Sequence, residues 1–212
     1  MGSWVLHAQK IKFIHIPKNA GSAISKWAKN QFPIVRVGPA THHSLIESNE
    51  LLPETKDYFS FCVIRNTYDR MVSLYEFTAI KAEKTFRRLE KRKNRGKTKV
   101  DAEKIRKRWE TILEYYNLGF NKWLDTPICL DHPGQLSYIF DEEGQQISYI
   151  VKYENFDNDI QIIKDRLGTD TPIKIANARE NPKPYQEYYD DETREKVYHM
   201  YKSEIDYFNF KF

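Results

Sequence analysis

The segment from Phe13 to Ala23, Phe-Ile-His-Ile-Pro-Lys-Asn-Ala-Gly-Ser-Ala, constrains the fold of this chain more than any other stretch. Residues 11–16 are mostly apolar, as in a buried central strand of a parallel sheet, and Pro17 ends that run. Ile24 and Trp27 then recur at helical spacing. A strand, a tight loop and a helix in this order predict an α/β fold.

The loop between this strand and helix combines small side chains with one lysine. Small residues let backbone N–H groups close around an anion at a helix N-terminus, and Lys18 adds a mobile positive charge beside it. The order differs from a Walker-type P-loop, in which the lysine follows the glycine. The pattern therefore predicts a phosphate site; the alternative is an ordinary strand-to-helix turn with a solvated lysine. The small residues are Asn19, Ala20, Gly21, Ser22 and Ala23.

A second apolar run, residues 58–64, ends in Arg65 and leads into a helical pattern that carries Ser73 about two turns later. In an open α/β sheet, ligands bind outside the carboxyl ends of the strands, so both motifs belong at one edge. A guanidinium with a hydroxyl suits a second phosphate. For Asp69 and Arg70, which follow closely, we favour a simple ion pair.

Together the two motifs resemble those of carbohydrate sulfotransferases, the group that includes the heparan and uronyl 2-O-sulfotransferases and the chondroitin-type enzymes. Those proteins show H-I-P-K-T-G-G-T-S after one strand and V-R-N-P-Y-D-R-L-V-S after another. This chain has His-Ile-Pro-Lys-Asn-Ala-Gly-Ser-Ala at 15–23 and Ile-Arg-Asn-Thr-Tyr-Asp-Arg-Met-Val-Ser at 64–73. The order, the strand contexts and the spacing from Arg65 to Ser73 all agree.

The resemblance implies the donor 3′-phosphoadenosine 5′-phosphosulfate (PAPS) and the product 3′-phosphoadenosine 5′-phosphate (PAP), without a metal. Residues 18–23 fall on the 5′-phosphosulfate site, and Arg65 and Ser73 on the 3′-phosphate site. Arg179 stands where relatives close a loop over the nucleotide, although a free surface arginine is an equal alternative. The implied acceptor is a glycan or another hydroxyl compound, whose identity stays open.

Several positions depart from the family pattern, and the larger changes are that Asn19 replaces Thr, Ala20 replaces Gly, Ala23 replaces Ser, and Thr67 replaces Pro. Alanine reaches a positive φ only at some energetic cost, so we expect the loop to sit slightly differently from the family norm. Ala23 removes one hydroxyl. Because the lysine and the backbone cradle are retained, we expect weaker contacts and not a loss of function.

Sulfuryl transfer needs a base for the acceptor hydroxyl, and two adjacent histidines lie between the motifs. Relatives carry a histidine followed one residue on by Ser or Thr, a spacing that His42 matches with Ser44, while His43 occupies the variable position. Imidazole accepts a proton near neutral pH. We therefore prefer His42 over His43; a surface or packed histidine pair is the alternative. A zinc site is disfavoured because no cysteine or further histidine stands at ligand spacing.

The length of 212 residues and the lack of a linker or internal repeat predict a single domain over 1–212. The expected fold is a P-loop-like three-layer α/β fold, in which helices flank a central, mainly parallel sheet. A further strand at 147–151, a helix at 159–167 and a final helix from 191 complete it. Val197, Tyr201 and Ile205 of the final helix should face the core.

A basic helical insertion is expected at about 78–118, interrupted near Gly96. Residues 81–108 contain 14 Lys or Arg and 4 Asp or Glu, whereas the whole chain has a net charge of only +4. A solvated, mobile hairpin is the first interpretation and a rim that attracts an anionic glycan the second. Nucleic-acid binding is not expected, because no recognised fold motif accompanies the charge.

Two other function classes fit the sequence less well than a sulfotransferase. A nucleotide or small-molecule kinase should need magnesium and a Walker-type order, and a non-catalytic polyanion-binding module leaves the paired phosphate motifs unexplained. No apolar run is long enough to span a membrane, and residues 1–6 lack the pattern of a signal peptide. We therefore expect a cytoplasmic enzyme, with a soluble domain of a Golgi membrane enzyme as the alternative.

Overall fold

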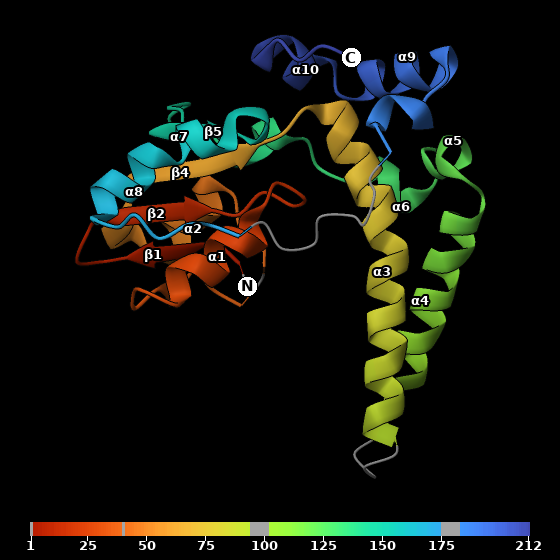
Figure 1. The fold of residues 1–212 in the computed structure, drawn as a ribbon, viewed down its shortest axis with the longest axis horizontal. Helices are drawn as coiled ribbons and strands as arrows, with labels where there is room; N and C mark the ends of the chain where they lie inside the picture. The colour runs from red at the N-terminus through yellow and green to blue at the C-terminus, as the bar shows by residue number, and fades with distance from the viewer. Residues whose placement is uncertain (1, 40, 94–101, 175–182) are drawn as a thin grey trace. The chain divides into compact units, whose positions relative to one another are not determined.

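The computed structural model describes residues 2–39, 41–93, 102–174 and 183–212. These residues form two compact units (Figure 1). The first comprises Met1–Asn66, Pro133–Pro182 and Asp206–Lys211, and the second comprises Thr67–His132, Lys183–Ile205 and Phe212.

The first unit is built on a five-stranded sheet in the order β3-β1-β2-β4-β5. Strands β2, β4 and β5 are parallel, whereas β1 runs antiparallel to both β2 and β3. The predicted α/β fold with parallel central strands is confirmed. The strands are β1 Trp4–Leu6, β2 Ile11–Ile14, β3 Val35–Arg36, β4 Phe59–Ile64 and β5 Tyr149–Lys152.

Alternating side chains of the central strands build two cores, one on each face of the sheet. Phe13 and Phe61 pack with α1 (Gly21–Lys29), α7 (Phe156–Asp159) and α8 (Gln161–Leu167). Ile14 and Cys62, one position further along, pack on the other face with α2 and the 3-10 helix η2. The result is the expected three-layer arrangement. The bounds of the remaining elements of this unit are α2 Leu45–Leu51, η1 Pro53–Thr55, η2 Gln135–Tyr138 and η3 Tyr153–Asn155.

The second unit is helical. Helix α3 (Thr67–Lys93) pairs with α4 (Ala102–Asn117), and α5 (Phe120–Trp123), α6 (Pro127–Leu130), η4 (Tyr185–Tyr188) and α9 (Asp191–Met200) complete it. Helix α9 begins with a capping box, in which Asp190 accepts from the N–H of Thr193. Helix α10 (Lys202–Phe208) follows, and Val197, Tyr201 and Ile205 are buried as predicted.

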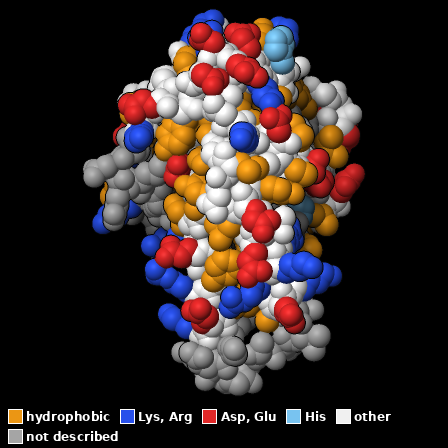
Figure 2. Space-filling view, turned by 90° about the vertical axis from the view of Figure 1, so that its right-hand side faces the viewer, with side chains coloured by type: hydrophobic (Ala, Val, Ile, Leu, Met, Phe, Trp, Pro, Cys, Tyr) orange, Lys and Arg blue, Asp and Glu red, His pale blue; other side chains and the backbone are white. Residues whose placement is uncertain are grey.

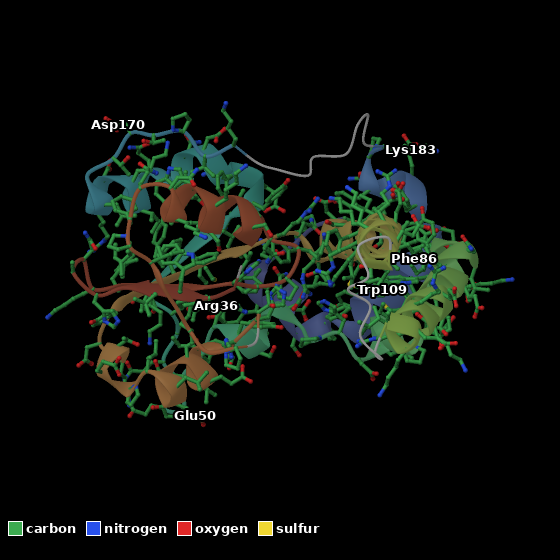
Figure 3. The ribbon with its side chains drawn as sticks, turned by 90° about the horizontal axis from the view of Figure 1, so that it is seen from below. Arg36, Glu50, Phe86, Trp109, Asp170 and Lys183 are labelled. Atoms are coloured by element: carbon green, nitrogen blue, oxygen red, sulfur yellow. The ribbon has the colours of Figure 1, made fainter. Side chains whose placement is uncertain are left out.

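The pair of helices α3 and α4 covers much of the segment expected to be a basic insertion. Its two aromatic side chains labelled in Figure 3 are half-buried and each lies under a cation: Lys81 over Trp109 at 5.4 Å and Arg106 over Phe86 at 5.7 Å. Such cation–π contacts cover apolar rings that two helices alone leave partly exposed. In Figure 2, basic and acidic side chains are interspersed with hydrophobic ones over this face.

Within the described ranges, every helix is too short or too polar to cross the apolar interior of a bilayer.

Candidate functional site

Strands β2 and β4 are parallel neighbours, with Ile14 opposite Cys62, so both end at the same edge of the sheet. The loop that carries Lys18 follows β2, and Arg65 comes directly after β4. Nη1 of Arg65 lies 3.4 Å from the backbone oxygen of Lys18. The structure therefore brings together the two motifs that the sequence predicted to meet at a carboxyl edge.

The loop after β2 turns sharply because two of its residues adopt left-handed backbone conformations. Lys18 has φ 71° and Ala20 has φ 57°. Ala20 adopts this conformation at the N-cap of α1, so the energetic cost expected for an alanine at a positive φ is present here, and the shift of the loop from the family norm stays a prediction. The cost for a non-glycine residue is about 1–2 kcal/mol, which the anchored surroundings must offset.

The N-terminus of α1 has the properties of an anion site. Ala20 supplies no side-chain cap, and the first turn carries no acidic residue. The Ala20 carbonyl accepts from the N–H groups of Ala23 and Ile24, at 2.9 and 3.2 Å. The N–H groups of Gly21 and Ser22 are thus the donors that the helix itself does not use. These donors and the positive end of the helix dipole favour a negatively charged ligand.

Position 21 requires glycine because another residue lies very close to it, and not because its φ angle is positive. A Cβ atom placed there would lie 2.0 Å from Cδ2 and 2.3 Å from Nε2 of His15. His15 is buried and stacks on Phe13 in the core, so its ring has little room to withdraw. The glycine of the motif therefore lets the loop close over the histidine that begins it.

A buried amide joins the two loops. Gln135, at the start of η2, accepts from Nδ2 of Asn19 at 2.6 Å and from the N–H of Arg65 at 2.9 Å, and donates to the Arg65 carbonyl at 2.9 Å. Asn19 also donates to the carbonyl of Val63 at 2.8 Å. The Asn19 side chain thus turns into the protein, and only its backbone is left to face a ligand. No sequence motif indicates this role of Gln135. We call its hydrogen bonds to Asn19 and Arg65 the Gln135 clamp.

Arg65 is held on its other side by an aromatic ring. Its guanidinium carbon lies 4.4 Å from the ring centroid of Tyr153, within the range of a cation–π contact. The next residue, Asn66, donates its N–H to Oε1 of Glu154 at 2.6 Å. Glu154 therefore has a structural role here. These contacts fix the backbone and the orientation of the guanidinium where β4 ends.

The two histidines between the motifs have different environments. His42 is exposed, and its Nδ1 lies 3.0 Å from the backbone oxygen of His15. A carbonyl can only accept a hydrogen bond, so Nδ1 carries the hydrogen, and Nε2 of the neutral ring is the nitrogen that can take up a proton. The rings of His15 and His42 also meet edge to face, with centroids 4.6 Å apart. His42 is thereby fixed in one tautomer beside the loop after β2.

His43, by contrast, is turned inward. Its side chain is buried beside Gly38, and among the described residues its Nδ1 has no hydrogen-bond partner. The hydroxyl of Ser3 accepts from the N–H of His15 at 3.0 Å and donates to the carbonyl of His43 at 3.3 Å. This hydroxyl therefore links the end of β2 to the backbone of His43. Of the two histidine rings, only that of His42 lies at the surface.

The other predicted site residues fall into three groups. Ser22 is exposed in the first turn of α1, while Ala23 is buried and packs into the core. Ser73 is half-buried in α3 and belongs to the second unit. Arg179 lies outside the described residues. The pairing of Arg65 with Ser73 and the nucleotide contact of Arg179 stay predictions.

No group of three or more His, Cys, Asp or Glu side chains that could hold a metal ion occurs within the part of the chain that the structure describes. Cys62 and Cys129 are buried free thiols, and burial raises the pKa of both, that of Cys129 to about 12. Thiols with raised pKa values are poor nucleophiles and poor metal ligands at neutral pH. Both cysteines are therefore packing residues.

Comparison with known proteins gives one match. A family model described as "Sulfotransferase family" matches residues 2–211, nearly the whole chain. The searches of curated proteins and of solved structures found no match.

Proposed function

We propose, since this chain belongs to the sulfotransferase family, that it transfers a sulfuryl group from PAPS to a hydroxyl group of a carbohydrate acceptor. Sulfuryl transfer in general follows from the family. PAPS as the donor, the carbohydrate acceptor and the roles of individual residues are our proposal, and the resemblance of the motifs at 15–23 and 64–73 supports them.

The observation that carries the proposal is the loop after β2. Two left-handed residues, a glycine packed against His15 and an uncapped helix N-terminus together fit an anionic phosphosulfate group. Lys18 is half-buried in this loop, next to the donors that α1 does not use. We assign the 5′-phosphosulfate to residues 18–23 for this reason.

For the 3′-phosphate we assign Arg65, whose guanidinium stacks on Tyr153 and so presents its planar fork in a fixed orientation. Ser73 is added from its sequence spacing to Arg65 and Arg179 from its place in the motif pattern. A nucleotide with phosphates at both ends would thus be distinguished from one that carries a 5′-phosphate chain alone.

In the proposed reaction the acceptor oxygen attacks sulfur in line with the bond to the 5′-phosphate oxygen. The new O–S bond forms as that bond breaks, and the electron pair leaves with the phosphate oxygen of PAP. Nε2 of His42 takes the hydroxyl proton, because Nδ1 already donates to the His15 carbonyl. Lys18 and the N–H groups of Gly21 and Ser22 stabilise the negative charge on the departing oxygen.

Calorimetry with purified protein tests this proposal. We expect PAP to bind without added metal and more tightly than ATP with magnesium, and Lys18→Ala to weaken PAP binding and to lower sulfation about 100-fold or more, because its charge is lost beside the leaving oxygen. Lys26→Ala is the matched control, since Lys26 is exposed on α1, the helix that follows this loop. Preference for ATP with magnesium, or full turnover by Lys18→Ala, would refute the proposal.

The assignment of the base is tested separately. His42→Ala should reduce kcat by about 10²–10⁴-fold with little change in PAP affinity, which is the usual range for loss of a general base. His43→Gln is the comparison, because His43 is buried and turned inward. Equal loss of kcat in both variants with normal folding would contradict the choice of His42.

A further inference from the structure

A pocket of about 290 Å³ lies within the second unit, and none of its lining residues is among those assigned above. Its size is at the lower end for small-molecule sites and suits a small group better than a polymer. It is lined by Tyr75, Glu76, Phe120, Lys183, Glu187 and Tyr188. They come from α3, α5 and the segment around η4, all described parts of this unit; Lys183 is labelled in Figure 3.

The planes of three aromatic rings that line the pocket are steeply inclined to one another. The centroids of Tyr75 and Phe120 are 5.5 Å apart at 72°, those of Phe120 and Tyr188 are 5.9 Å apart at 77°, and those of Tyr75 and Tyr188 are 6.4 Å apart at 74°. Three planes at such angles form a corner rather than a flat stack. A group seated in such a corner can lie close to three rings at once, within the roughly 6 Å over which a ring attracts a cation.

The polar side of the pocket carries more negative than positive charge. Glu76 lies beside Tyr75 on α3, Glu187 is exposed on η4, and Lys183 is an exposed side chain with a long, flexible stem. The hydroxyl of Tyr188 donates to Oε1 of Glu76 at 2.9 Å, which holds this carboxylate at the edge of the ring corner. Two carboxylates against one ammonium leave a net charge of about −1.

The ionisation of Tyr75 agrees with this distribution. Burial is the main cause that raises its pKa to about 12, and the nearby charge of Glu76 raises it further. Of these two causes only the negative charge of Glu76 favours a positive charge next to the ring, because burial opposes a charge of either sign.

We propose that this pocket binds an organic cation of the alkylammonium class, with its alkyl groups against Tyr75, Phe120 and Tyr188 and its charge facing Glu76 and Glu187. Aromatic faces attract such a cation, whose charge is spread over methyl groups and which is more weakly hydrated than a metal ion. A neutral sugar ring could use the aromatic surface, but it would gain nothing from the net negative charge. The proposal does not depend on the sulfotransferase assignment.

The test is calorimetry on the full chain with choline and with its uncharged carbon analogue, in which a tert-butyl group replaces the trimethylammonium group. The two probes have nearly the same shape, so any difference in affinity reports the positive charge. We expect saturable binding of choline and at least about tenfold weaker binding of the analogue. No binding of choline, equal binding of the two, or preferential binding of glucose would each overturn the proposal.

Variants then locate the site. Glu76→Gln keeps the side-chain shape and should weaken choline binding about tenfold through the lost charge, whereas Lys183→Ala should strengthen it. Glu83→Gln is the matched control, because Glu83 is exposed on the same helix, pairs with Arg87 and does not line the pocket. If Glu76→Gln and Glu83→Gln behave alike, the site is not this pocket. PAP affinity, measured on the same samples, reports separately on the donor site.

Discussion

Replacing Lys12 by methionine should change how the stability of the protein depends on pH. Lys12 is in β2, and although it is charged in water its side chain is fully buried. Its Nζ donates to Oδ1 of Asn49 on α2 at 2.6 Å. Burial lowers the pKa of Lys12 from 10.5 to about 8, and the nearby carboxylates, Glu142 first among them, offset only part of that effect.

The magnitude follows from the difference between the folded and unfolded pKa values. A shift of one unit corresponds to about 1.4 kcal/mol, so the change from 10.5 to about 8 implies a penalty of roughly 3 kcal/mol for keeping Lys12 charged in the fold. Below pH 8 the penalty is fully present, because the lysine is protonated in both states. As pH rises from 8 to 10.5 the folded state releases its proton first, so this contribution raises stability.

Urea unfolding of the wild type and of Lys12→Met between pH 7 and 10 measures the effect. Buried tyrosines complicate the absolute curves: the raised pKa of Tyr75, about 12, favours the unfolded state once ordinary tyrosines ionise. The difference between the two proteins cancels that contribution. Relative to Lys12→Met, the wild type should gain about 2 kcal/mol between pH 8 and pH 10.

Lys104→Met is the control, because Lys104 is exposed on α4, and it should leave the pH dependence unchanged. If the difference in the free energy of unfolding between the wild type and Lys12→Met were constant over this range, the reasoning would be refuted. That result would mean that folding does not lower the pKa of Lys12. The hydrogen bond to Asn49 is lost at every pH and therefore shifts the curve without changing its slope.

Three further outcomes are expected around the loop after β2. Gly21→Ala should weaken PAP binding at least about tenfold in calorimetry, because the new methyl group would overlap the ring of His15, whose contact atom is 2.0 Å away; unchanged affinity would contradict this packing. Ala20→Gly should raise the free energy of unfolding by up to about 1 kcal/mol in urea, since it relieves the left-handed alanine; a loss of stability would speak against strain there. Gln135→Ala should cost about 1–3 kcal/mol of stability, because it leaves partly buried backbone groups of Arg65 unpaired, and normal stability would show that water replaces the amide.

The central part of the fold was predictable because its signals are local. The apolar runs at 11–16 and 58–64 become β2 and β4, and the small residues after the first run become the turn into α1. The strands β1 and β3 were not predicted. They have three and two residues, too few for a periodic pattern, and form because β2 offers an edge to which β1 pairs, and β1 in turn offers an edge to β3.

The candidate site was predictable where a motif marks it and not where the fold assembles it. Lys18, Gly21 and Arg65 stand in recognisable patterns. Gln135 does not, because its partners Asn19 and Arg65 lie 116 and 70 residues away, and no local spacing records such contacts. The buried lysine of β2 was missed for the same reason: its burial results from packing on the face that α2 covers.

The Gln135 clamp couples the loop after β2 to the loop after β4, so that the two must move together. An amide that accepts from Asn19 and bonds to both backbone groups of Arg65 does not allow either loop to open while the other stays in place. A ligand that contacts both loops therefore orders them in a single step, so the conformational entropy of the protein is lost only once. A ligand that contacts one loop orders both, and so it causes the same loss of entropy with fewer contacts. Substitutions in the two loops should for this reason be non-additive, and their coupling should disappear when Gln135 is removed.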